Sequence, residues 1–156
     1  MNRRIFFRGK RLDNHEWVYG YYVLNNKVSF IETVNLEEDY DIINSVDTAT
    51  VGQYTGSNDK CDNKIFEGDI VDVKFFEDYS KHYICSFKNS SFVLYHYVEG
   101  SKEICSLSSV CSCDAEYAVI GNIYDNPELV ESCVGSSLEL DLCSFCESDV
   151  LHVSDI

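Results

Sequence analysis

Hydrophobic and polar side chains alternate along several stretches of the chain, as they do in β-strands that bury one face. In residues 69–75 the alternation predicts a strand with Val71, Val73 and Phe75 inward and the polar residues between them facing water. A second strand is predicted at 16–23, where one face carries four apolar side chains: Trp17, Tyr19, Tyr21 and Val23. The pattern indicates a mainly β protein.

Two neighbouring apolar runs, 83–87 and 92–98, are separated by the short polar stretch 88–91. This arrangement predicts a β-hairpin. Residues 117–124 are rich in β-branched and aromatic side chains and predict one more strand.

The segment after this last strand predicts a short helix. Pro127 lacks the N–H that a strand needs but suits the first position of a helix. We expect a helix over residues 128–132, with Asn126 as its N-cap. Residues 35–47 are acidic and fit either a surface loop or a short helix. Helices are therefore expected to be short.

Composition and charge narrow the classes of function. The 156 residues, 45% of them hydrophobic, are enough for one domain with a core of its own. No apolar run approaches the roughly 18 residues of a membrane helix, and no secretion signal is recognised. With 27 acidic and 12 basic residues the net charge is −15, which should repel nucleic acid and anionic membranes.

The composition shifts near the C-terminus. No Lys or Arg follows Lys102, and residues 131–156 are acidic and rich in serine and cysteine. We expect a β-rich domain at 1–130 and a loosely attached acidic tail at 131–156.

Eight cysteines allow a metal site to be considered. Free thiols are the default expectation for a chain without an export signal, so no cofactor is expected. A zinc-stabilised structural module is the alternative. Zinc would take four thiolates, usually from two C-x-x-C pairs, but only one pair in this sequence has that spacing. Its ligands would be Cys111, Cys113, Cys143 and Cys146.

The sequence contains no recognisable catalytic motif, and we assign no catalytic residue. His96 is expected to be a hydrogen-bonded residue at the rim of the core, and His15, His82 and His152 are expected to be exposed. The expectation is that the protein is not an enzyme, with an unrecognised small enzyme as an alternative.

The N-terminus combines cations with aromatic residues. Such a cluster could bind single-stranded nucleic acid through phosphate contacts and base stacking. The residues concerned are Arg3, Arg4, Phe6, Phe7, Arg8, Lys10 and Arg11. The favoured interpretation is an edge strand whose cations pair with the protein's own carboxylates.

Four blocks of sequence, at 7–20, 50–56, 65–71 and 119–129, together resemble the YopX family of phage and prophage proteins. The resemblance implies a small SH3-like barrel with additional N-terminal strands, encoded by a phage or prophage and acting in the bacterial cytoplasm. It implies no particular activity.

The positions that carry this resemblance are expected to specify turns and core rather than binding. They are Arg8, Gly9, Lys10, Trp17, Tyr19, Gly20, Gln53, Tyr54, Gly56, Glu67, Gly68, Asp69, Gly121, Asn122 and Pro127. The chain departs from the family pattern at 13–15 and 59–64, where relatives typically carry a glycine and this sequence has none.

Charge and resemblance together predict a non-enzymatic accessory protein that binds a host or phage macromolecule. Its acidic surface could occupy the cationic groove of a host DNA-handling or defence protein. The sequence leaves the partner and the oligomeric state open.

Overall fold

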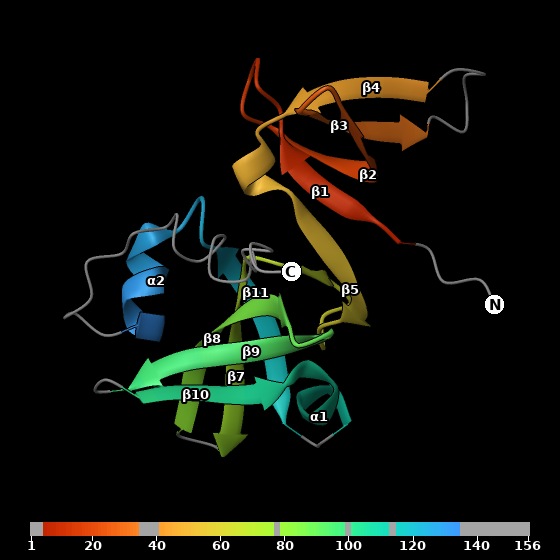
Figure 1. The fold of residues 1–156 in the computed structure, drawn as a ribbon. Coiled ribbons are helices and arrows are strands. Elements are labelled where there is room, and N and C mark those ends of the chain that lie inside the picture. The colour runs from red at the N-terminus through yellow and green to blue at the C-terminus, as the bar shows by residue number, and fades with distance from the viewer. Residues whose placement is uncertain (1–4, 35–40, 77–78, 99–100, 113–114, 135–156) are drawn as a thin grey trace, which may run out of the picture.

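The computed structural model describes residues 5–34, 41–76, 79–98, 101–112 and 115–134. These residues form two antiparallel β-sheets, two short α-helices and one 3-10 turn. Figure 1 shows the smaller sheet below the larger one, with β5 running from one toward the other. The expectation of a mainly β protein with short helices is confirmed.

The larger sheet has six strands in the order β4-β3-β2-β1-β5-β6. Their bounds are β1 Phe7–Lys10, β2 Trp17–Asn25, β3 Val28–Val34, β4 Asp41–Val46, β5 Gly52–Asn58 and β6 Lys64–Phe66. The 3-10 turn Thr48–Thr50 (η1) joins β4 to β5. β1 is therefore a central strand, and the expectation of an edge strand at the N-terminus is wrong.

The smaller sheet has five strands in the order β10-β9-β8-β7-β11. They are β7 Asp69–Phe76, β8 Tyr79–Lys88, β9 Ser91–Val98, β10 Ser101–Ser106 and β11 Glu116–Asn122. Helix α1 spans Leu107–Ser112 and α2 spans Pro127–Val134. No closed barrel is found in the described segments, so the SH3-like barrel is not confirmed.

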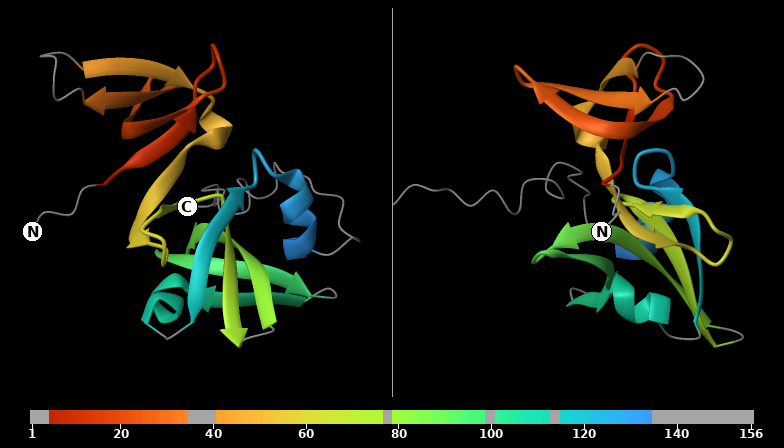
Figure 2. Two further views of the ribbon diagram at one scale, coloured as in Figure 1. Left: turned by 180° about the vertical axis from the view of Figure 1, so that it is seen from behind. Right: turned by 90° about the vertical axis from the view of Figure 1, so that its right-hand side faces the viewer.

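Each face of the five-stranded sheet carries a cluster of buried apolar side chains. Val71 and Val73, as predicted, are fully buried with Tyr83, Leu94 and the residues of α1; the side chain of Phe75 lies outside the description. Ile70, on the other side of β7, packs against α2. Figure 2 shows the sheet between its two helices.

The predicted hairpin of 83–87 and 92–98 is confirmed as β8 and β9. Asn89 and Ser90 in its turn have φ angles of 50° and 64°, as a two-residue turn of type I′ requires.

Other local predictions need correction. Residues 41–46 are neither loop nor helix but the strand β4, which hydrogen-bonds to β3 from Ser29 to Val34; residues 35–40 lie outside the described part. Pro127 does begin a helix, but Asn126 does not cap it with its side chain. The Oδ1 of Asn126 instead accepts the N–H of Asn122, because the strand-to-helix turn folds back on itself.

The expected boundary at residue 130 falls within α2, which continues to Val134. Residues 135–156, most of the predicted tail, lie outside the described residues.

A loop protects the outer edge of β11. The N–H of Lys60 donates to the carbonyl of Tyr117 at 3.1 Å, and the buried carboxylate of Asp59 accepts the N–H of Val119 at 2.9 Å. Burial raises the pKa of Asp59, but hydrogen bonds from Asn63, Val119 and Cys61 outweigh it and leave this pKa below its usual value.

Both departures from the family pattern place a non-glycine residue in the left-handed region. His15 has a φ of 59° and Asp62 a φ of 68°. A side chain in this conformation costs roughly 1–2 kcal/mol. Glycine at these turns would avoid that cost.

We expect His15→Gly to stabilise the protein by about 1 kcal/mol, since the side chain of His15 is exposed and its backbone bond to Arg11 would remain. The thermal midpoint should rise by roughly 2–4 °C, as measured by calorimetry. Asn89→Gly is the matched control, because asparagine tolerates a positive φ, and should change the midpoint less. An unchanged or lower midpoint for His15→Gly would contradict the argument.

Candidate functional site

A buried ion pair joins the two sheets. Arg8 of β1 places Nη2 2.6 Å from Oδ1 of Asp69, at the start of β7. The same nitrogen donates to the carbonyl of Glu67 at 3.1 Å, and the other oxygen of Asp69 accepts the N–H of Phe66 at 2.7 Å. The sharp turn between Phe66 and Asp69 is possible because Gly68 has a φ of 80°.

The pair is almost completely withdrawn from water: Arg8 is 6% exposed and Asp69 is 1% exposed. The guanidinium lies over the rings of Trp17 and Phe66, at 4.6 and 5.0 Å from their centroids. Burial raises the pKa of Asp69 to about 6, although the charge of Arg8 opposes the rise.

A cleft of about 640 Å³ opens beside this ion pair, between the two sheets. Its apolar walls are Phe6, Tyr19, Phe66 and Val119, and its polar lining is Arg8, Asp69, Asp62, Asn63 and Lys64. The volume is within the range of pockets that bind small ligands or peptide side chains.

The aromatic wall of the cleft continues along one face of the six-stranded sheet. Residues that pair directly across antiparallel strands share a face, and Tyr21 pairs with Glu32, which pairs with Ile43. Tyr19, Tyr21, Val23 and Ile43 on this face are 43%, 39%, 40% and 64% exposed. We call this surface, together with Phe6, the aromatic face.

A second junction between the sheets centres on Asp125, in the turn between β11 and α2. Its carboxylate accepts hydrogen bonds from Lys10, from Trp17 Nε1 at 2.7 Å and from Asn122 Nδ2 at 2.9 Å. Tyr124 packs its ring against Trp17 and donates its hydroxyl to the carbonyl of Ala49 at 2.7 Å. Burial raises the pKa of Asp125, but the three donors outweigh it and lower the pKa to about 2.

Asp125→Asn should therefore reduce stability above about pH 4 and matter less in acid. The folded pKa of about 2 lies below the usual 3.8, so the stabilisation is present above 3.8 and is lost as the pH falls through 2. Urea unfolding of both proteins across this pH range, followed by the fluorescence of Trp17, would measure the difference. A difference that stays constant with pH would contradict the assignment.

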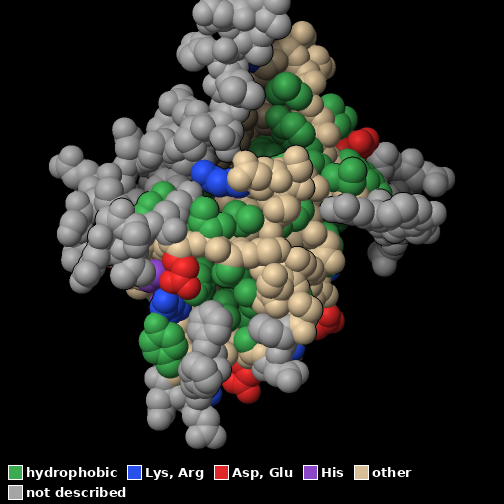
Figure 3. Space-filling view, turned by 60° about the horizontal axis from the view of Figure 1, so that its bottom comes forward, with side chains coloured by type: hydrophobic (Ala, Val, Ile, Leu, Met, Phe, Trp, Pro, Cys, Tyr) green, Lys and Arg blue, Asp and Glu red, His purple; other side chains and the backbone are tan. Residues whose placement is uncertain are grey.

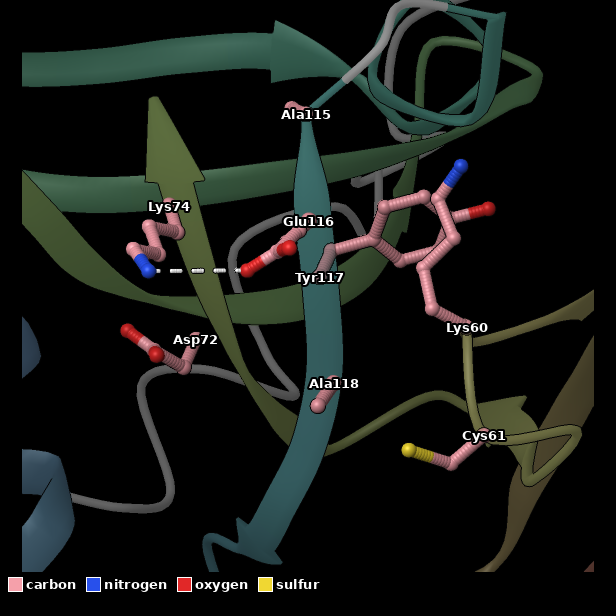
Figure 4. Close-up of a pocket in the computed structure, with 8 residues that line it drawn as sticks. All are labelled: Lys60, Cys61, Asp72, Lys74, Ala115, Glu116, Tyr117 and Ala118. Carbon is pink, nitrogen blue, oxygen red and sulfur yellow. Dashed lines mark ion pairs between the residues drawn. The ribbon is translucent and has the colours of Figure 1, made fainter. Parts of the chain in front are cut away.

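A second hollow, of about 450 Å³, lies beside β11 (Figure 4). Lys74 and Glu116 form an ion pair of 3.6 Å across it, and Lys60 lies over the ring of Tyr117, 5.1 Å from its centroid. Charges of both signs line this hollow, and they do not converge on one point as they do at Arg8 and Asp69.

A serine, a histidine and an aspartate meet between α2 and the five-stranded sheet. His82 Nδ1 lies 2.7 Å from Ser132 Oγ, and its Nε2 lies 3.6 Å from Asp72. Ser132 donates its proton to the carbonyl of Leu129 at 2.5 Å, so the hydroxyl is not held by His82 for attack. His82 is half-buried rather than exposed, so the prediction for it needs correction; it tethers α2 to the sheet.

The other histidines are placed as far as the described residues reach. His96 is partly buried, and its Nδ1 lies 2.9 Å from the carbonyl of His82, as the prediction of a hydrogen-bonded rim residue requires. His15 is exposed as predicted, and His152 lies outside the described part.

Most of the predicted zinc ligands lie outside the residues that the structure describes. Cys111 packs against the core of the five-stranded sheet, whereas Cys113, Cys143 and Cys146 lie outside the described residues. Within the described ranges, no three His, Cys, Asp or Glu side chains group as metal ligands, and no helix is long and apolar enough to cross a membrane.

The three N-terminal cations that the structure describes pair with carboxylates of the same chain. Arg8 pairs with Asp69, Lys10 with Asp125 and Arg11 with Asp13. Phe6 lines the cleft and Phe7 packs against Tyr22 on the opposite side of the sheet; Arg3 and Arg4 lie outside the described residues. The predicted pairing with carboxylates is confirmed for the three cations that the structure describes.

Comparison with known proteins shows the family to which the chain belongs. The sequence profile of the family described as YopX protein matches residues 6–131. The chain belongs to the YopX family.

The crystal structure of protein EF1440 from Enterococcus faecalis is similar in fold to this YopX protein. It has a TM-score of 0.53 and 22% sequence identity, over 83% of this chain and 100% of that one. No curated protein matches.

The positions that carry the YopX resemblance gather around the two junctions. Arg8, Glu67 and Asp69 form the buried one, Lys10, Trp17 and Asn122 surround Asp125, and Tyr19 lines the cleft. The others lie in β1, β2, β5, the 66–69 turn, β11 and the start of α2: Gly9, Gly20, Gln53, Tyr54, Gly56, Gly68, Gly121 and Pro127. That they serve turns and core stays a prediction.

Sequence patterns missed most of the other cleft residues. Phe66 precedes Glu67 directly within a YopX block, so its place in the site could have been inferred from that block. Val119 likewise begins the 119–129 block. Asn63 and Lys64 carry no comparable signal, because only the meeting of the two sheets brings them to the cleft.

Proposed function

We propose that this YopX protein is a non-enzymatic accessory protein, encoded by a phage or prophage and acting in the bacterial cytoplasm, that works by binding another macromolecule. The contact surface is the aromatic face with its adjoining cleft. The exposure of this face is the single observation that carries the proposal.

Exposed tyrosines support a protein partner. Tyrosine provides a rigid, amphipathic contact area at low cost in side-chain entropy and is enriched in protein interfaces. Tyr19 and Tyr21 lie on the same side of β2 as Val23, and Ile43 lies on the same face two strands away, with Glu32 of β3 between Tyr21 and Ile43. Apolar groups gathered on one surface, rather than scattered singly, mark interaction sites.

Charge favours a cationic partner. Among the described residues, five of the 12 Lys and Arg side chains are tied up in ion pairs, namely Arg8, Lys10, Arg11, Lys74 and Lys81. Acidic side chains outnumber basic ones by 15 whether or not they are paired, and this excess suits an inhibitor of a host DNA-handling or defence protein. On the face that Figure 3 presents, acidic and basic side chains are interspersed. At this face, long-range steering by the net charge would supply the attraction.

The test is capture of a defined partner from bacterial lysate by the immobilised protein, followed by measurement of its affinity. Tyr21→Ala combined with Ile43→Ser should weaken binding by at least about tenfold, since central aromatic contacts dominate interface energies. Raising the salt concentration should weaken it further.

The control is Tyr79→Ala, because Tyr79 is 50% exposed on the other sheet. Its affinity should stay within about twofold of the unaltered protein. Equal losses of affinity in the double variant and in Tyr79→Ala would count against the proposed surface. An affinity that does not change with salt concentration would count against an electrostatic contribution.

A further inference from the structure

Glu32 of β3 lies in the middle of the aromatic face. It pairs with Tyr21 of β2 on one side and with Ile43 of β4 on the other. Side chains that pair directly across antiparallel strands have Cβ atoms roughly 4.5–5.5 Å apart. The carboxylate is therefore flanked by an aromatic ring and by an aliphatic side chain, and these two residues are 39% and 64% exposed.

No Lys or Arg side chain of the described residues pairs with Glu32. Those that form ion pairs contact other acids, namely Asp69, Asp125, Asp13, Glu116 and Glu103. Glu32 is half-buried, and no hydrogen bond from the described residues reaches its carboxylate. Its oxygens are not among the buried polar atoms that lack a partner, so they are accessible from solvent. A carboxylate beside apolar groups attracts a cation more strongly than one surrounded by water, because the local dielectric is lower.

The ion pair between the two sheets shows which cation suits such surroundings. Arg8 contacts the carboxylate of Asp69 at 2.6 Å, and its guanidinium lies over the rings of Trp17 and Phe66. Arginine makes both contacts at once because its guanidinium is planar, weakly hydrated and carries N–H groups along its edge. Lysine has a compact, strongly hydrated ammonium group that cannot stack flat on a ring.

We propose that Glu32 and Tyr21 bind an arginine side chain of the partner protein. The carboxylate accepts N–H groups of the guanidinium, the ring of Tyr21 stacks on its plane, and Ile43 contacts the methylene stem. This inference rests on the proposed function and names the chemistry of the partner residue at the contact surface. A second copy of this chain is a poorer occupant, because both copies carry a net charge of −15.

The test uses acetyl-Leu-Arg-Leu-amide and its counterparts with lysine or citrulline at the central position. Titration of the arginine peptide into the ¹⁵N-labelled full chain should shift the backbone amide signals of Tyr21, Glu32 and Ile43 saturably. The lysine peptide should bind about fivefold more weakly because it lacks the planar cation. The citrulline peptide should bind at least about tenfold more weakly because it lacks the charge.

Three outcomes of these titrations overturn the proposal. One is the absence of a saturable shift at these signals up to the solubility limit of the arginine peptide. Another is equal affinity for the arginine and lysine peptides, since charge alone would then explain the binding. The third is a shift that follows the concentration of the protein instead of the peptide, which would assign the face to a second copy of the chain.

Variants test the acid and the ring separately. Glu32→Gln keeps the size of the side chain, so the fold should persist, and it should weaken the arginine peptide at least about fivefold. Glu116→Gln removes the same charge from an exposed position on the other sheet, so its affinity should stay within about twofold of the unaltered protein. Tyr21→Phe should bind normally, whereas Tyr21→Leu should lose about threefold because the ring is gone. Equal losses in Glu32→Gln and Glu116→Gln would contradict a site at Glu32.

The same variants separate this inference from the proposed function. A captured partner whose affinity falls with Tyr21→Ala and Ile43→Ser but not with Glu32→Gln leaves the proposed function standing and overturns the arginine site. Saturable binding of the arginine peptide without any captured partner does the reverse.

Discussion

Arg8→Met is expected to lower the free energy of unfolding by about 3–5 kcal/mol at around pH 8, because it leaves the carboxylate of Asp69 buried without its counter-ion. Methionine keeps much of the apolar stem of Arg8 and removes only the guanidinium that lies over Trp17 and Phe66. The loss should therefore report mainly on charge, and urea unfolding would measure it.

The pH dependence of this loss follows from the pKa of Asp69, which is already about 6 with Arg8 present. Removing Arg8 raises it further, so the fold of the variant favours the protonated acid more strongly. A folded pKa above the usual 3.8 gives stability that is present at low pH and lost as the pH rises through the folded value. The gap between wild type and Arg8→Met should accordingly narrow toward about pH 4.

Two controls make this result decisive. Arg11→Met removes the cation of an exposed pair with Asp13 and should leave stability nearly unchanged. Adding Asp69→Asn to Arg8→Met should recover much of the loss, because the lone buried charge is then gone. A loss that is independent of pH and is not recovered in the double variant would show that packing, rather than charge, holds the junction.

Gly20→Ala should destabilise the protein by about 3 kcal/mol or more. A Cβ on Gly20 would lie 2.0 Å from the carbonyl oxygen of Glu32, in the neighbouring strand β3. Neither backbone can move away without breaking the pairing of β2 with β3, so the clash cannot be relieved by a side-chain rotation. Thermal and urea unfolding of the purified variant would measure the loss.

Gly56→Ala is the matched comparison, because a Cβ there meets nothing within 4 Å although φ is 88°. Its cost should be limited to backbone strain of roughly 1–2 kcal/mol. If both substitutions cost the same, close approach of the strands is not what requires glycine at position 20.

The alternation of apolar and polar residues predicted the strands well where one face of the strand is buried and the other faces solvent. Val71 and Val73 on β7 illustrate this, since their alternation reflects two different surroundings. The pattern failed at β4, where Ile42 and Ile43 are both exposed and the strand is held by its pairing with β3 rather than by burial. It also gave no sign that the aromatic side of β2 faces solvent.

The candidate site was harder to foresee because it is assembled from distant segments. Arg8 and Asp69 each stand in a recognisable block of the sequence. Their pairing depends on how β1 approaches β7, which belongs to the other sheet. The basic N-terminal cluster was interpreted from its charge, and the structure gives its described members carboxylate partners that lie as far away as Asp125. Spacing along the chain carries no information about such contacts.

The loop that covers the edge of β11 affects the tendency of the protein to aggregate. Unpaired strand edges recruit strands from other molecules and start aggregation. Asp59 and Lys60 occupy the groups through which β11 would add a further strand. Growth of an intermolecular sheet is thereby blocked at this side of the molecule.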